Sequence, residues 1–189
     1  DYFLEHFSSK IEMKMPLPMM NILNGGAHAN NKLDFQEFMI QPVGFSSFKE
    51  GLICGVEVFN YLKKTLNQKG FSTAVGDEGG FAPGIDSAEE ALDLISSSID
   101  AAGYKVDKDV TFALDCAATE LLNNNEYVFS NDERLSSGEL IEYLAKLANS
   151  YPLTSIEDGL DENDWSGWEN LTKKLGEKTQ LVGDDLFVT

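Results

Sequence analysis

The sequence predicts an α/β protein built from parallel β/α units, and three observations support this fold class. Strand-like and helix-like segments alternate over residues 110–184, which is typical of parallel β/α architecture. Three of the predicted strands end in a carboxylate, at Asp115, Glu157 and Asp184. The separations of 42 residues (157 − 115) and 27 residues (184 − 157) match the ~30 residues of a β-strand crossover unit.

The composition excludes several functional classes. The chain has 189 residues, of which 42% are hydrophobic, as is ordinary for a globular protein with one good-sized core. Thirty-two acidic residues against 14 basic ones give a net charge of −18, which repels nucleic acid and anionic membrane surfaces. The two cysteines, Cys54 and Cys116, indicate a reducing compartment, and no apolar run approaches the ~20 residues of a membrane span.

The first third of the chain predicts two strands separated by a loop. Residues 1–14 are polar and mixed, and we interpret them as a connecting segment. Residues 15–23 are apolar but contain two prolines, which favours an edge strand. A flexible loop is expected at residues 24–28, and a second strand at residues 35–41 carries Glu37, a costly residue in apolar surroundings unless it is paired.

Two helices follow in succession. Ser47 and Ser87 each precede a glutamate by three residues, which predicts a capped helix start at both positions. Gly70 and Gly103 are predicted to end the helices. Apolar residues at helical spacing predict the buried faces, namely Leu52, Val56, Phe59, Leu62 and Leu66 in the first helix, and Ala91, Ile95, Ile99 and Ala102 in the second.

The second half predicts the regular alternation. A buried strand over residues 110–114 is followed by a hairpin around three asparagines at residues 123–125. A helix capped by Ser136 and Glu139, a short strand over residues 153–156, a further helix and a last strand then complete the chain. The last helix is predicted to bury Trp165, Trp168, Leu171 and Leu175.

The loop between the two consecutive helices has an unusual composition. Residues 75–80 read Val-Gly-Asp-Glu-Gly-Gly, so Asp77 and Glu78 are bracketed by glycines that let a backbone approach a ligand closely. An ordinary solvated turn is the alternative, because Gly and Asp are both common turn residues. The recurrence of acids at the predicted strand ends favours a functional loop.

The strand-end acids predict a cation site. Asp115, Glu157 and Asp184 would repel one another strongly, and a divalent ion with hard oxygen ligands, such as Mg²⁺, would neutralise them. These acids could instead cap the elements that follow them. Glu37 and Glu78 are further acids on neighbouring segments, and a carboxyl group close to other carboxylates can act as a general acid near neutral pH.

With these residues identified, the sequence resembles the enolase family, of the bacterial type. The resemblance implies a partial TIM-like barrel that begins with two strands and two helices before βα repeats, with about half of the barrel present. It also implies a Mg²⁺-dependent glycolytic lyase that interconverts 2-phosphoglycerate and phosphoenolpyruvate. Six motifs carry it, at residues 21–28, 35–42, 75–80, 114–117, 155–158 and 182–189.

The same resemblance implies roles for individual residues. Asp115, Glu157 and Asp184 resemble the tighter Mg²⁺ site, and the last two would also contact the substrate. Glu78 resembles the acid that protonates the departing 3-hydroxyl, and Glu37 a second carboxylate beside it that also meets the substrate. His28 resembles a loop residue that closes towards the substrate phosphate.

Some residues and segments of the family pattern are not found in this sequence. Its lysine base would follow Thr189, and an N-terminal domain would precede residues 1–14, so residues 15–189 are expected to be the first part of a barrel domain. Lys173, Lys174 and Lys178 lie on or just after a helix and cannot replace that base.

The resemblance further implies a homo-oligomer and a cytoplasmic location, although family members also occur at bacterial cell surfaces. Two alternatives remain. The chain could belong to a related dehydratase that acts on an acid sugar, or it could be a non-catalytic binding module.

Overall fold

The computed structural model describes residues 15–188, so the predicted connecting segment at residues 1–14 lies outside the described part. Its main sheet has five strands in the order β1-β2-β3-β7-β8 and does not close into a barrel. The first three strands are antiparallel, and β3, β7 and β8 are parallel, which confirms the predicted architecture. The strands are β1 (Met20–Asn24), β2 (Glu37–Gln41), β3 (Thr111–Asp115), β7 (Leu153–Glu157) and β8 (Gln180–Val182).

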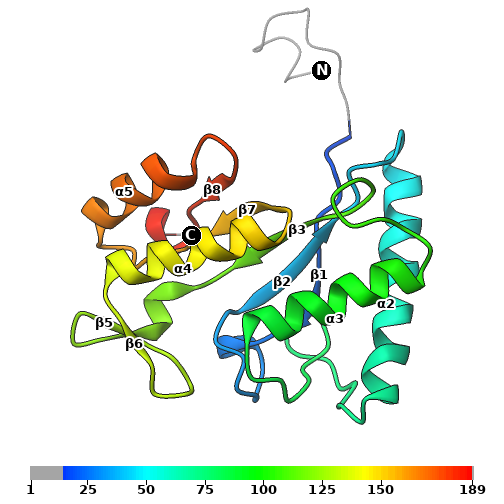
Figure 1. The fold of residues 1–189 in the computed structure, drawn as a ribbon, viewed down its shortest axis with the longest axis horizontal. Coiled ribbons are helices and arrows are strands. Elements are labelled where there is room, and N and C mark those ends of the chain that lie inside the picture. The colour runs from blue at the N-terminus through cyan, green and yellow to red at the C-terminus, as the bar shows by residue number, and fades with distance from the viewer. Residues whose placement is uncertain (1–14, 189) are drawn as a thin grey trace, which may run out of the picture.

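Four helices accompany this sheet in two pairs. Figure 1 shows α2 (Phe48–Gln68) and α3 (Ala88–Ala101) beside the β1–β2 end, and α4 (Ser137–Ser150) and α5 (Trp165–Leu175) beside the β7–β8 end. Buried apolar side chains from the strands and from all four helices form one hydrophobic core. No helix in the described range combines the length and the hydrophobicity that a membrane crossing requires.

The helices α2, α3 and α4 begin where the sequence predicts a cap. The hydroxyl oxygens of Ser47, Ser87 and Ser136 accept hydrogen bonds from the backbone N–H groups three residues later. At Ser136 the Glu139 carboxylate also accepts from the backbone N–H of Ser136, which completes a capping box. Gly70 and Gly103 follow α2 and α3 with φ values of +80° and +91°, in the left-handed region that favours glycine.

The predicted buried face of α2 was partly wrong. Leu62 and Leu66 are buried as predicted, but Leu52 is 44% exposed and Val56 is 52% exposed. The helix also buries residues that were not predicted, namely Gly51, Cys54, Gly55 and Val58. The cause is close packing against the segment that leads into β1. A Cβ at Gly51 would lie 3.1 Å from Pro18 Cγ, and one at Gly55 would overlap the Met20 side chain. Two glycines therefore lie on the packed face of α2. The prediction counted only apolar side chains, so it placed the buried face on a different side of the helix.

The predicted stripe of α3 is confirmed, since Ala91, Ile95 and Ile99 are fully buried. In α5, Trp168, Leu171 and Leu175 are buried as predicted, but Trp165 is 63% exposed. Trp165 is the first residue of the helix, directly after the N-cap Asp164, and its side chain lies beyond the packed stripe.

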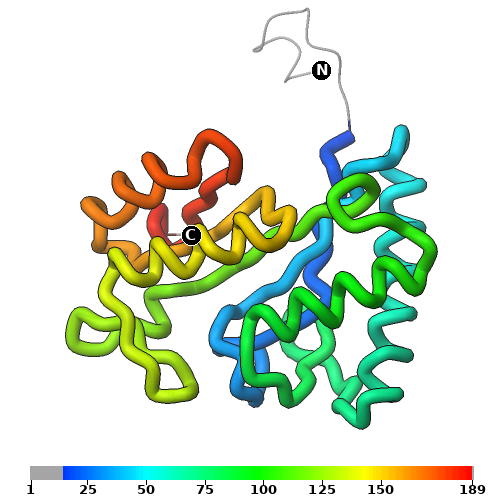
Figure 2. Tube along the Cα trace, viewed as in Figure 1, coloured from blue at the N-terminus to red at the C-terminus, as the bar shows by residue number. Residues whose placement is uncertain are grey.

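A small antiparallel sheet follows β3 and confirms the predicted hairpin. Strands β4 (Leu122–Asn123) and β5 (Glu126–Val128) flank Asn124 and Asn125, which have φ values of 51° and 67°. A third strand that was not predicted, β6 (Arg134–Leu135), pairs with β5. The tube in Figure 2 follows this excursion as it projects away from the main sheet before α4.

The loop predicted at residues 24–28 is more ordered than expected. Asn24 is the last residue of β1, and residues 26–28 form a 3₁₀ turn, η1 (Gly26–His28). The N–H of Gly25 donates to the carbonyl of Gln36, and that of Gly26 donates to the carbonyl of Leu33. These bonds join the turn to the segment that leads into β2.

A neutral polar row crosses the end of the sheet where the parallel strands begin. The Thr154 hydroxyl is hydrogen-bonded to Gln41 and Thr111, and the Thr111 hydroxyl donates to Gln41 Oε1 at 3.3 Å. This row joins β2, β3 and β7 through uncharged side chains. It lies opposite the strand ends that carry the acids.

Candidate active site

Strand register brings three acids into one row. Glu37 at the start of β2 is the register partner of Asp115 at the end of β3, and Asp115 is the partner of Glu157 at the end of β7. Glu157 is in turn the partner of Val182, so Asp184 follows two residues beyond the last paired position of β8. The C-terminal edge of the parallel strands therefore carries the predicted acids side by side, as the sequence pattern implies.

The ligand atoms of these residues form two groups. Carboxylate oxygens of Glu157, Asp158 and Asp184 lie within 4.8 Å of one another, and so do ligand atoms of His28, Glu37 and Glu78. Asp115 belongs to neither group. Its Oδ1 accepts a hydrogen bond from the Ala117 N–H at 3.0 Å, and its Oδ2 accepts one from Gln36 Nε2 at 3.4 Å.

Asp158 is a site residue that the sequence reasoning did not single out. It is 3% exposed, and its carboxylate accepts hydrogen bonds from the N–H groups of Asp184 and Asp185, at 3.1 Å and 2.8 Å. These bonds fix the turn that presents Asp184. The sequence signal that could have identified Asp158 is the pair of adjacent acids at a strand end, Glu157 and Asp158. In such a pair, one carboxylate can face the site while the other accepts hydrogen bonds from the next loop.

The strand-end acids lie in an environment that disfavours their charge. Burial is the main cause that raises the pKa of Asp115 to about 7, and the carboxylates of Glu37 and Asp158 act in the same direction. The pKa of Glu157 is also raised to about 7, first by burial and then by Asp115. Among the ion pairs of the described residues, none involves Asp115, Glu157 or Asp184. The site therefore has a strong local excess of negative charge.

The second group joins two loops to β2. His28 Nδ1 lies 3.5 Å from Glu37 Oε1, and the carbonyl of His28 accepts a hydrogen bond from the Asp77 N–H at 3.1 Å. Burial raises the pKa of Glu37, and the nearby carboxylates of Glu78 and Glu157 raise it further. A carboxyl group with a raised pKa thus lies next to Glu78, which is exposed in the 75–80 loop.

The 75–80 loop is a closed turn. The Gly76 N–H donates to the Gly80 carbonyl at 2.8 Å, the Gly79 N–H donates to the Gly76 carbonyl at 3.2 Å, and Gly79 has a φ of +84°. A cleft of about 930 Å³ opens beside it, lined among others by His28, Lys32 and Asp77.

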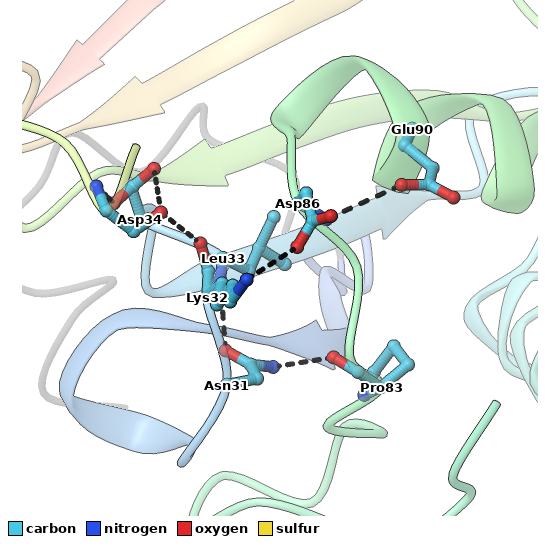
Figure 3. A network of polar contacts seen from close by, with 8 residues as sticks. Asn31, Lys32, Leu33, Asp34, Pro83, Asp86 and Glu90 are labelled. Carbon is cyan, nitrogen blue, oxygen red and sulfur yellow. Dashed lines mark hydrogen bonds and ion pairs between the residues drawn. The ribbon is translucent and has the colours of Figure 1, made fainter. Parts of the chain in front are cut away.

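Polar contacts also fix the opposite wall of this cleft. Lys32 Nζ lies 4.0 Å from Asp86 Oδ1, and Asn31 Nδ2 donates to the Pro83 carbonyl at 3.0 Å (Figure 3). The Asp86 N–H contacts Glu90 Oε2 at 3.4 Å in the same network. The residues 31–34 are thereby joined to the start of α3.

The lysines of α5 lie where the sequence predicts them, away from the strand ends. Lys173 pairs with Glu169 at 2.6 Å, and Lys174 pairs with Glu142 of α4 at 2.7 Å. Both belong to the last turn of α5. They stabilise the helix surface and do not reach the acidic row.

Comparison with known proteins agrees with this geometry. Residues 12–189 match the sequence profile of the family described as "Enolase, C-terminal TIM barrel domain". The chain is 58% identical over 178 residues to proteins named "Enolase" from Legionella pneumophila strains Corby, Paris and Philadelphia 1. The match covers 94% of this chain and 42% of the length of each relative. The chain therefore belongs to the enolase family and corresponds to its C-terminal TIM barrel domain.

Proposed function

We propose that the protein carrying this chain is a Mg²⁺-dependent lyase that reversibly dehydrates 2-phosphoglycerate to phosphoenolpyruvate. The observation that carries the proposal is the row of acids from Glu37 to Glu157, in a chain whose relatives are named enolases. The residues 1–14 are proposed to connect to a preceding domain, and residues 15–189 to form the first part of the barrel. A homo-oligomer in the cytoplasm, with a small-molecule substrate, is part of the same proposal.

The donor set fits Mg²⁺. Carboxylate oxygens are the hard ligands that this ion prefers, and a few protein ligands leave positions for water and substrate. Glu157, Asp184 and Asp115 are the proposed ligands. These three are the residues that the family resemblance implies. Asp158 lies beside Glu157 and Asp184, and we propose that it orients the turn that carries Asp184, because its carboxylate accepts from the Asp184 and Asp185 backbone. The raised pKa values of Asp115 and Glu157 support a cation here, since burial and neighbouring carboxylates both disfavour the ionised forms and a positive charge would offset both effects.

Bound Mg²⁺ would stabilise the negative charge that accumulates on the substrate carboxylate when the neighbouring proton is removed. Glu78 is proposed as the general acid that protonates the leaving hydroxyl. Glu37 supports it from beside Glu78, because burial first and neighbouring carboxylates second raise the pKa of Glu37 and so favour its protonated form. His28 is proposed to contact the substrate phosphate from η1. The described residues hold no lysine at a strand end, so the base is proposed to come from a further part of the protein.

The experiment is an assay of the full-length protein with 2-phosphoglycerate, followed by the ultraviolet absorbance of phosphoenolpyruvate. We expect turnover with Mg²⁺, none with excess chelator, and a loss of ~10²–10⁴-fold in kcat for Glu78→Gln. Glu177→Gln is the matched control, because Glu177 is an exposed glutamate in the loop after α5. The isolated chain is expected to be inactive.

Two results would contradict the proposal. Turnover of sugar acids without turnover of 2-phosphoglycerate would indicate a related dehydratase. Mg²⁺ binding without turnover of either substrate class would indicate a non-catalytic binding role.

A further inference from the structure

Asn24 has a buried side-chain amide with no hydrogen-bond partner. The residue is 0% exposed at the end of β1, and neither its Oδ1 nor its Nδ2 is hydrogen-bonded. An amide removed from water without compensation is destabilising, so buried amides in folded proteins are nearly always paired. The position of Asn24 therefore indicates a partner that this arrangement does not supply.

The amide lies against both ends of the 75–80 loop. A Cβ built on Gly76 would lie 2.7 Å from Asn24 Nδ2, and one built on Gly80 would overlap Asn24 Oδ1. These two glycines are themselves joined by the hydrogen bond from the Gly76 N–H to the Gly80 carbonyl. The Asn24 side chain thus fills the space beneath the loop that carries Glu78.

The backbone of Asn24 is fixed while its amide is not. Its N–H donates to the Phe81 carbonyl at 2.8 Å, and its carbonyl accepts from Asn31 Nδ2 at 3.0 Å. Asn31 also holds the Pro83 carbonyl, as Figure 3 shows. Across the β1–β2 pair, Asn24 is the register partner of Glu37. It therefore has a fixed position next to Glu37 in the sheet and against the loop that carries Glu78.

The loop has hydrogen-bonding groups that match the amide. Within residues 15–188, neither the Glu78 N–H nor the Gly80 N–H donates a hydrogen bond. An asparagine amide offers an acceptor oxygen and two donor hydrogens. A rotation of the Asn24 amide, with a small adjustment of the loop, would let Oδ1 accept from the Gly80 N–H without breaking the Gly76–Gly80 turn.

We propose that Asn24 is a positioning residue for the 75–80 loop, acting through a hydrogen bond from the Gly80 N–H to its Oδ1 that holds Glu78 beside His28 and Glu37. The catalytic part of this inference rests on the proposed function. The structural part does not, since it concerns only the order of the loop. Glu78 touches the substrate in this scheme, and Asn24 acts only through Glu78.

The test uses Asn24→Leu in the full-length protein, because leucine has the same branched shape and number of heavy atoms as asparagine and no hydrogen-bonding group. The loss of a single hydrogen bond to one loop is expected to lower the melting temperature only slightly. We expect kcat to fall at least ~10-fold with KM within ~2-fold, because a displaced acid affects the transition state more than substrate binding. If Asn24 had only a packing role, the substitution would not lower kcat selectively while leaving KM unchanged.

A double-mutant cycle identifies the route of the effect. If Asn24 acts through Glu78, adding Asn24→Leu to Glu78→Gln changes kcat by less than ~2-fold relative to Glu78→Gln alone. Asn21→Leu is the matched control, since Asn21 lies three residues earlier on β1 with an equally unpartnered amide and has Met39 as its register partner. Its kcat is expected to stay within ~2-fold of the wild type.

Hydrogen exchange separates this inference from the proposed function. Asn24→Leu is expected to speed exchange at Gly80 and Glu78 by at least ~10-fold, and Asn21→Leu is not. If the wild type does not convert 2-phosphoglycerate, the proposed function fails, and the exchange result still decides the role of Asn24. Wild-type exchange rates and wild-type kcat in Asn24→Leu, or multiplicative losses in the cycle, would overturn the inference.

Asn24→Ser provides a second variant if leucine prevents folding. Serine cannot overfill the space against Gly76 and Gly80, and it retains one hydroxyl. A smaller fall in kcat at an unchanged melting temperature supports the inference, and wild-type kcat together with wild-type exchange overturns it.

Discussion

The two halves of the sheet position their acidic side chains by different means. In the parallel half, Asp115 and Glu157 are the last residues of adjacent strands, and the register alone makes them neighbours. In the antiparallel half, His28 and Glu78 belong to loops whose backbones touch, as in the bond from the Asp77 N–H to the His28 carbonyl. Regular pairing is sufficient for the first arrangement, whereas the second depends on glycines that allow close approach.

The strongest test of this contrast is Gly80→Ala in the antiparallel half. The added methyl would overlap Asn24 Oδ1 and lie 2.8 Å from the backbone of Ile22 and Leu23, so the loop or β1 must shift. We expect a loss of about 2–3 kcal/mol in the free energy of unfolding, measured by urea denaturation. Gly84→Ala is the control, because a Cβ there meets nothing within 4 Å, and it should stay within ~0.5 kcal/mol of the wild type. Equal effects in the two variants would refute the dependence on close approach.

A second test concerns the parallel half and the turn after β8, which the Asp158 carboxylate holds in place. Asp158→Ala removes the acceptor for the N–H groups of Asp184 and Asp185, so the turn after β8 loses the contact that orients Asp184. We expect Mg²⁺ affinity, measured by isothermal titration calorimetry, to weaken ~10–100-fold, as is usual when a group that orients a ligand is lost. Asp158→Asn keeps one acceptor oxygen and should lose less. Unchanged affinity in Asp158→Ala would show that register alone is sufficient on this side.

The third test is the pH dependence of stability in metal-free protein. The pKa of Asp115 is about 7 in the fold, against an ordinary value near 4, so the folded state binds more protons between these values. The stabilising contribution of the protonated form is fully present below about pH 4 and is lost as the pH rises through about 7. Asp115→Asn cannot ionise, and its side-chain oxygen can still accept from the Ala117 N–H.

We therefore expect Asp115→Asn to be more stable than the wild type at pH 8 by about 1–2 kcal/mol in the presence of a chelator. At pH 4 the two proteins should unfold at nearly the same urea concentration. If Asp115→Asn is less stable than the wild type at pH 8, the fold does not destabilise the ionised form of Asp115.

The smallest effect is expected at the surface of the parallel half. Trp165→Ala should change the free energy of unfolding by no more than ~0.5 kcal/mol, because the side chain is 63% exposed. Trp168→Ala, three residues along the same helix and 7% exposed, should cost about 3–5 kcal/mol. A large loss for Trp165 measured by thermal denaturation would place a partner surface over it in the intact protein.

The elements that the sequence predicts well are those determined by local chemistry. Helix starts at Ser47, Ser87 and Ser136 follow from a side chain bonding its own backbone three residues on, and the structure confirms them. The strands that end at Asp115 and Glu157 follow from short apolar runs that stop at a carboxylate. Neither feature requires knowledge of distant contacts.

The features that escaped prediction depend on partners far along the chain. Leu52 and Leu62 both belong to the apolar stripe predicted for α2, and Leu52 is exposed because Pro18 and Met20 pack against Gly51 and Gly55 on another side of the helix. The role of Asp158 depends on the backbone of a turn 26 residues later. The contact between the 75–80 loop and η1 cannot be derived from the residues alone, and only the family resemblance suggested that His28 and Glu78 act together.

The polar row of Gln41, Thr111 and Thr154 adds a consequence for how this scaffold can change. At one end of the sheet, hydrogen bonds between uncharged side chains join strands β2, β3 and β7. At the other end, the carboxylates of the same three strands repel one another. Substitutions among the acids would then alter reactivity without loosening the tied end, and substitutions among the hydroxyls would weaken the scaffold without touching the chemistry. Such a division lets selection act on durability and on the proposed catalysis separately, within three adjoining strands.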